Sequence, residues 1–248
     1  MAADLVQVKS EYPAAINVIS DVAKRFFGYE FSDADLEVLN LLASVSSRVD
    51  SLYDGTELYD QRSYIACDVL RLLGGEVAGS VFDDVLARDI RRLGAISEEN
   101  NASEFIGRVD EILSIGEIIF SLEDVRGLTD LIAREGEVTA DLGCMLVPSM
   151  PERFKDFLKC IGRAGNIFDD LIDIHDDVDN GVRACTPGLR YYVTMGFALT
   201  KEVLSCFLIF PAKLRLVRFF VKFVASAIPK IISRRSFMPP SDFDQALE

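Results

Sequence analysis

The stretch of residues 162–181 reads GRAGNIFDDLIDIHDDVDNG. On a helix turning about 100° per residue, one set of its polar residues falls on a narrow face, with Asp170 and Asp177 at the edge. That set comprises Gly162, Asn166, Asp169, Asp173, Asp176 and Asn180. Such crowding costs about 0.3 kcal/mol for each pair of like charges four residues apart. A bound cation would remove that cost, and the interleaved apolar residues indicate packing into a bundle. The alternative is a solvated, charged helix end.

A second acidic pair lies far upstream, where residues 47–55 read SRVDSLYDG. Asp50 and Asp54 are four apart and therefore share a helix face just before Gly55. Two carboxylate helices that face each other across a bundle can hold Mg²⁺ between them, and the ions can hold a diphosphate. Candidate contacts to the phosphate oxygens, each with ordinary surface arginine as its alternative, are Arg48, Arg62, Arg183 and Arg190.

Most of the chain carries apolar residues at three- and four-residue steps, and strand-like alternation is nearly absent. The spacing predicts helices over residues 14–27, 33–52, 59–73, 77–93, 103–122, 125–146, 153–178 and 191–209. Breaks are expected at glycines such as Gly28 and Gly94. We therefore expect an all-α bundle of about eight or more helices, in one domain spanning residues 1–248.

The composition of the chain argues against several classes of function. The chain has 248 residues, half of them apolar, with 26 Lys and Arg against 40 Asp and Glu and a net charge of −14. This acidity argues against nucleic-acid binding. A single histidine, His175, and five scattered cysteines exclude a His-rich zinc site and a Ser-His-Asp triad, so a metal would be held by oxygens, as Mg²⁺ is. The irregular cysteine spacing and the absence of a signal-like N-terminus favour the cytoplasm.

The C-terminal segment, residues 201–238, has the opposite charge. It carries one acid, Glu202, and eight bases: Lys201, Lys213, Arg215, Arg218, Lys222, Lys230, Arg234 and Arg235. Its apolar runs are too interrupted for a transmembrane helix, which needs about 18 apolar residues. Two interpretations remain open. The segment closes the bundle with its bases in water, or it is a basic amphipathic helix in peripheral contact with an anionic membrane.

These motifs resemble a known family. SRVDSLYDG is similar to the first aspartate motif of squalene and phytoene synthases, and residues 157–181, FLKCIGRAGNIFDDLIDIHDDVDNG, resemble the second. GEVTADLGCMLVPSM, residues 136–150, resembles the small-residue helix that lines the pocket of that family. The run from Asp169 to Asp173 is also similar to the DDxxD of prenyl diphosphate synthases and class I terpene synthases. The resemblance covers residues 44–192 and implies the all-α class I isoprenoid synthase fold.

The resemblance also implies roles for individual residues. Asp50, Asp54, Asp169 and Asp173 would be the catalytic Mg²⁺ ligands, with three ions expected and Mn²⁺ as the alternative metal. Additional ligands, or residues that support the ligands from behind, would be Asn166, Asp170 and Asp177. The prenyl cavity would be lined by Tyr53, Tyr64, Phe168 and the segment Gly143, Cys144 and Met145, for which the alternative is core packing. Helix geometry, and not the resemblance, places His175 away from the acidic stripe, so it is expected to be structural or a hydrogen-bonding neighbour. A homodimer is implied by the family alone.

The sequence also departs from the family. Asp169 stands where head-to-head synthases usually have Arg, the homoallylic-site patch of chain-elongating enzymes is missing, and the part after the second motif is short. We therefore expect a terpene synthase, a carbon–oxygen lyase, or a prenyltransferase that ionises one C15 or C20 allylic prenyl diphosphate and releases pyrophosphate. The alternatives are head-to-head condensation of two prenyl diphosphates and a non-catalytic binding or assembly protein with the same fold.

Overall fold

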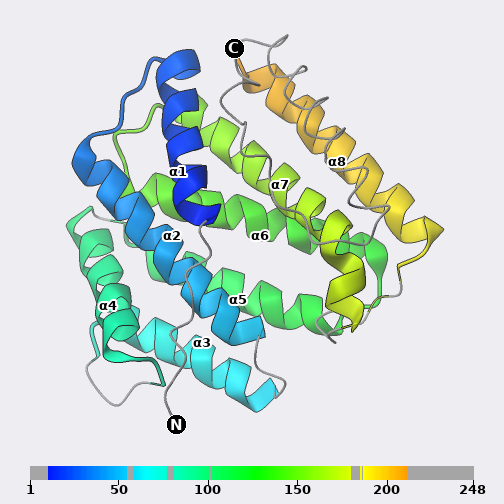
Figure 1. Ribbon diagram of the computed structural model, residues 1–248, viewed down its shortest axis with the longest axis horizontal. Helices are drawn as coiled ribbons and strands as arrows, with labels where there is room; N and C mark the ends of the chain where they lie inside the picture. Colours follow the sequence, from blue (N-terminus) through cyan, green and yellow to red (C-terminus); the bar gives the residue numbers. More distant parts are fainter. Residues whose placement is uncertain are drawn as a thin grey trace. The chain divides into compact units, whose positions relative to one another are not determined.

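The computed structural model describes residues 11–54, 59–76, 81–100, 102–179, 185 and 187–211, without the side chains of residues 11–14, 54, 59–61, 176, 177 and 179. These residues form helices and no strand (Figure 1), which confirms the predicted all-α class. The elements are α1 (Glu11–Val22), the π-helical turn η1 (Ala23–Phe27), α2 (Asp33–Asp54), α3 (Tyr59–Leu73), α4 (Asp84–Glu99), α5 (Phe105–Ser121), α6 (Val125–Leu146), α7 (Glu152–Asp179) and α8 (Leu189–Ile209).

The chain divides into two compact units. Unit 1 comprises residues 1–113 and 142–150, and unit 2 comprises residues 114–141 and 151–248. Helices α5 and α6 contribute residues to both units. The single domain expected from the sequence stays a prediction.

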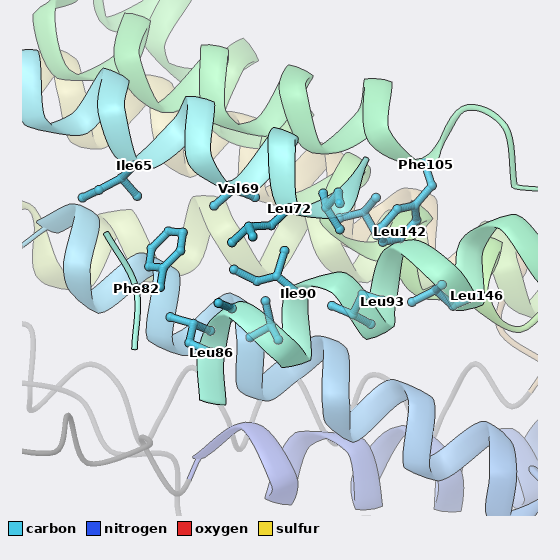
Figure 2. Packing of buried hydrophobic residues seen from close by; sticks show 13 residues of the cluster. Ile65, Val69, Leu72, Phe82, Leu86, Ile90, Leu93, Phe105, Leu142 and Leu146 are labelled. Atoms are coloured by element: carbon cyan, nitrogen blue, oxygen red, sulfur yellow. The ribbon is translucent and has the colours of Figure 1, made fainter. Parts of the chain in front are cut away.

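The core of unit 1 lies between α3 and α4, with further residues from α5 and α6. Ile65, Val69 and Leu72 of α3 point toward Leu86 and Ile90 of α4 (Figure 2). The two helices approach closely at Gly94, where an added Cβ would lie 2.2 Å from the carbonyl oxygen of Leu73. Burial of these aliphatic side chains is the main stabilising contribution, at about 25 cal/mol for each Å² of apolar surface removed from water.

Helix α4 corrects the predicted helix over residues 77–93. It begins only at Asp84, because the carboxylate of Asp83 caps it by accepting a hydrogen bond from the Leu86 amide at 2.8 Å. That amide bond, together with Arg48 and against the opposing effect of burial, lowers the pKa of Asp83 below its usual range. The predicted end near Gly94 is also wrong. Gly94 continues the helix and provides the close approach to α3, and α4 ends at Glu99.

The core of unit 2 joins α5, α6, α7 and α8, and α8 packs along α7 (Figure 1). Its fully buried aliphatic side chains include Ile119 of α5, Leu128 and Ile132 of α6, and Ile167 and Ile174 of α7. Helix α7 thus has an apolar side that holds it in the bundle, as the interleaved apolar residues of the sequence predict.

Candidate functional site

Helix α7 carries the acidic stripe. Ile167 and Ile174 are completely buried, whereas Asp169 is exposed and Asn166 and Asp173 are half-buried. The last three side chains are three and four residues apart on one continuous helix, so they lie along one side of it. The structure therefore brings these three predicted ligands together on a single face.

Two glycines let α6 and α7 touch through their backbones within unit 2. An added Cβ on Gly136 would lie 2.1 Å from the carbonyl oxygen of Gly162, and one on Gly162 would lie 2.2 Å from the carbonyl oxygen of Gly136. Both distances are far below van der Waals contact, so only glycine fits on either side of this crossing. The crossing sits one helical turn before Asn166 and thereby sets how near α6 comes to the acidic stripe.

The crossing brings a carboxylate of α6 against the stripe. Asn166 donates a hydrogen bond from Nδ2 to Oε2 of Glu135 at 3.3 Å. Because the amide nitrogen of Asn166 faces Glu135, the amide oxygen of Asn166 points away from Glu135. Sequence reasoning missed Glu135. Its position immediately before Gly136, at the start of the small-residue segment, is the signal that could have found it.

Asp170 lies on a different side of α7 from Asp169. It is buried, and its carboxylate accepts a short hydrogen bond from the hydroxyl of Tyr191 on α8, which also lies 3.1 Å from the Asp170 carbonyl oxygen. Tyr191 is itself fully buried in the unit 2 core. Asp170 was predicted as an additional or supporting metal ligand; in the structure its carboxylate joins α7 to α8, and the predicted role stays a prediction.

The Tyr191–Asp170 contact leads to a stability prediction. Tyr191→Phe is expected to lower the free energy of unfolding by about 2 kcal/mol, because the buried carboxylate of Asp170 loses a donor and cannot regain water. Urea unfolding followed by circular dichroism measures this. Tyr192→Phe is the matched control, and we expect it to cost about 1 kcal/mol or less, since its partner His175 is only half-buried. A larger loss in the control would contradict the assignment.

His175 has a polar partner on α8. Its Nε2 lies 2.9 Å from the hydroxyl of Tyr192, within hydrogen-bond distance. Together with the bond between Tyr191 and Asp170, this gives α7 and α8 two neighbouring polar contacts near the acidic stripe. The expectation that His175 is a hydrogen-bonding residue is confirmed.

In unit 1, the first acidic motif lies at the end of α2. Asp50 is exposed, and the side chain of Asp54 lies outside the described residues. Arg48 is turned toward α4, where its guanidinium lies 2.7 Å from the carboxylate of Asp83 and 3.9 Å from that of Asp89. Arg48 was proposed as a phosphate contact, and in this structure it pairs with two carboxylates.

Arg62 and Tyr53, predicted for different roles, meet within unit 1. The guanidinium carbon of Arg62 lies 5.4 Å from the centroid of the Tyr53 ring, a cation–π geometry, and Arg62 is buried. Tyr53 also packs against the unit 1 core. Tyr64, in contrast, is 72% exposed.

The other candidate residues are distributed over both units. Gly143 and Cys144 are buried and Met145 half-buried on the part of α6 that belongs to unit 1, and Phe168 is buried in unit 2. Arg190 is exposed in the first turn of α8. Arg183 and the side chain of Asp177 lie outside the described residues.

The donor chemistry of the α7 stripe suits a hard cation. Its side chains offer carboxylate and amide oxygens, which Mg²⁺ prefers. Among the described side chains, no group of three or more His, Cys, Asp and Glu residues is arranged to hold a metal ion, and this set leaves out Asp54, Asp176 and Asp177. The residues therefore fit Mg²⁺ by chemistry, and the metal stays a prediction.

Helix α8 has an apolar exposed side. Large apolar side chains are exposed to solvent at steps of four or seven residues, namely Leu189, Val193, Phe197, Leu204 and Leu208. In the described part of the chain, α8 alone is long and apolar enough to cross a membrane, judged by length and composition. This exposed stripe of α8 begins near Tyr191 and runs into the predicted basic segment at residue 201.

Comparisons of the chain with protein-family models, with curated proteins and with solved structures find no match.

Proposed function

We propose that this protein is a Mg²⁺-dependent synthase of the class I isoprenoid type, which ionises an allylic prenyl diphosphate and releases pyrophosphate. One observation carries the proposal: the oxygen donors of Asn166, Asp169 and Asp173 lie along one side of a helix whose position is set by the Gly136–Gly162 crossing. Rigid placement of a donor row is what a diphosphate-binding metal site requires. The resemblance of the two aspartate motifs supports the same assignment.

The metal would be held by Asp169, Asp173 and Asn166 of α7. Asp50 and Asp54 are proposed as ligands on the resemblance of their motif alone. When bound, Mg²⁺ supplies charge neutralisation and Lewis acidity to the departing pyrophosphate. The protein's own contribution is orientation. Glu135 accepts a hydrogen bond from Nδ2 of Asn166, which would leave the amide oxygen of Asn166 as the ligand atom for a cation.

Asp170 has a different role in this proposal. Because its carboxylate is buried against Tyr191, we assign it to positioning: it fixes α8 against the acidic helix and thereby helps to hold the neighbouring Asp169 in place. Residues that hold the ligands of a metal site in place commonly contribute about 10- to 100-fold to metal affinity or activity.

The test is a product assay with the full chain. Farnesyl and geranylgeranyl diphosphates are incubated with the protein and Mg²⁺, and pyrophosphate and extracted hydrocarbons are measured. We expect release of pyrophosphate that stops when EDTA removes the metal. A C15 or C20 terpene supports the proposal, whereas a C30 or C40 product selects head-to-head condensation. No metal-dependent release from any prenyl diphosphate would overturn the proposal and favour a non-catalytic protein.

We also propose that α8 and the basic segment contact an anionic membrane. Phe197 is 75% and Leu208 76% exposed on one side of α8, and residues 201–238 carry eight bases and one acid. Apolar side chains that enter the interface and bases that pair with anionic headgroups reinforce each other. Residues 212–238 lie outside the described part, so their contribution here is their charge.

Vesicle flotation of the full chain tests this partner. We expect binding to vesicles that contain phosphatidylglycerol and little binding to pure phosphatidylcholine. Phe197→Glu should lower the bound fraction about tenfold, because it replaces an inserting ring by a charge. Thr200→Glu adds the same charge at a polar exposed position of α8 and should have a small effect. Equal losses in both variants, or no flotation of the unaltered protein, would contradict a membrane-contacting face.

A further inference from the structure

Two cysteines of unit 2 face each other across the α7–α8 contact. Cys160 lies on α7 and Cys206 on α8, their sulfurs are hydrogen-bonded, and they are 3% and 0% exposed. All five cysteines of the chain are thiols. Cys160 and Cys206 form a pair at the contact between α7 and α8, separate from the acidic stripe.

The positively charged guanidinium of Arg163 lies beside Cys160. Arg163, one turn after Cys160, donates a hydrogen bond from its guanidinium to the Cys160 sulfur at 3.0 Å. The same guanidinium is fixed by Glu202 of α8 at 2.6 Å and by Glu137 of α6 at 3.4 Å. Because three helices hold the guanidinium in place, its positive charge stays next to the Cys160 sulfur.

The surroundings shift the pKa values of the two thiols in opposite directions, which makes Cys160 the nucleophile and Cys206 its partner. The hydrogen bond from Cys206, assisted by the charge of Arg163 and opposed by burial, lowers the pKa of Cys160 to about 7. The same hydrogen bond, with burial, raises the pKa of Cys206. The lowered pKa favours the thiolate of Cys160, the reactive form of cysteine, and the raised pKa keeps the Cys206 thiol protonated beside it.

We propose that Cys160 and Cys206 form a peroxide-sensitive modification site that closes to a disulfide between α7 and α8. The Cys160 thiolate attacks one oxygen of hydrogen peroxide, the O–O bond breaks, and hydroxide leaves, so that sulfur is oxidised to sulfenic acid while peroxide is reduced. The Cys206 sulfur then attacks the sulfenic sulfur. The S–S bond forms, the S–O bond breaks, and the thiol proton leaves with the hydroxyl group as water.

The disulfide between Cys160 and Cys206 would add a covalent link to the contact between α7 and α8. Cys160 stands nine residues before Asp169 on the same helix, and Cys206 follows Tyr191, the partner of Asp170, on α8. The disulfide would tie the two helices together at their far ends, opposite the Tyr191–Asp170 bond. The inference depends on these contacts and is independent of the proposed enzymatic activity.

The experiment treats the reduced full chain with hydrogen peroxide, blocks the remaining thiols with iodoacetamide, and identifies peptides by mass spectrometry. We expect a cross-linked peptide pair containing Cys160 and Cys206, lost after dithiothreitol. The oxidised protein should melt about 5 °C higher than the reduced protein, because the link restricts the unfolded chain. Neither measurement needs a variant.

Variants separate the two steps. In Cys206→Ser the cross-link and the melting shift should be lost, and dimedone should trap sulfenic acid at Cys160, since no thiol can resolve it. Cys144→Ser, which removes another buried thiol, should keep the cross-link. The proposal is overturned if peroxide oxidises the exposed Cys67 but leaves Cys160 and Cys206 unlinked, or if Cys160 links to a different cysteine in the unaltered protein.

Discussion

Asp169→Ala is expected to lower metal-dependent pyrophosphate release at least about a thousandfold, because it removes a ligand that neutralises charge on the departing diphosphate. Asp169 is exposed, so its removal costs no packing, and the helical circular dichroism signal should stay unchanged. Asp50→Ala, on α2, is expected to have the same effect. Pyrophosphate release at saturating Mg²⁺ measures both.

The matched control for this prediction is Asp156→Ala. Asp156 is an exposed carboxylate on the same helix, and its position 13 residues earlier puts it on a side away from the acidic stripe. Its activity should remain within about twofold of the unaltered protein, as for surface changes outside a site. Unchanged activity in both Asp169→Ala and Asp50→Ala would refute the site assignment.

Gly162→Ala is expected to lower the free energy of unfolding by about 3 kcal/mol, the larger end of the overpacking range. The added methyl would lie 2.2 Å from the carbonyl oxygen of Gly136 and 3.1 Å from Cβ of Ala140. A backbone carbonyl inside a helix cannot rotate aside as a side chain does, so α6 and α7 must separate. Urea unfolding measures the loss, and the Asn166–Glu135 contact should weaken with it.

Gly165→Ala, on the same helix, controls for the change of residue type. No atom lies within 4 Å of a Cβ added there, and the residue is exposed. Alanine should therefore stabilise the protein by about 0.5–1 kcal/mol through its higher helix propensity. If the two substitutions had equal effects, the close crossing of α6 and α7 would be contradicted.

Several helices could be predicted closely from periodicity. The predicted helices over residues 59–73 and 125–146 coincide with α3 and α6, and the one over 153–178 is within one residue of α7 at each end. The failures have local causes. Gly94 was interpreted as a break, but it lies inside α4. A glycine is needed there because the backbone of α3 occupies the space that a side chain would take. A glycine chosen for close approach has the same appearance in the sequence as one chosen for a turn.

The candidate site shows the same limit. Helical spacing placed Asn166, Asp169 and Asp173 together because all three belong to one helix. Asp170 was grouped with them as an acid next to that face, and the structure shows it buried against Tyr191. Glu135 was missed, since it reaches Asn166 from another helix, 31 residues away in the sequence.

The amino-acid sequence was therefore enough for the helical class and for the acidic side of α7, because both follow from the period of a single helix. The partners of those acids depend on the packed structure. Glu135 beside Asn166, Tyr191 on Asp170 and Cys206 beside Cys160 all come from contacts between helices. Such contacts depend on where two helices cross, and α6 and α7 of unit 2 cross at the glycines at positions 136 and 162, whose role became visible once the helices were packed.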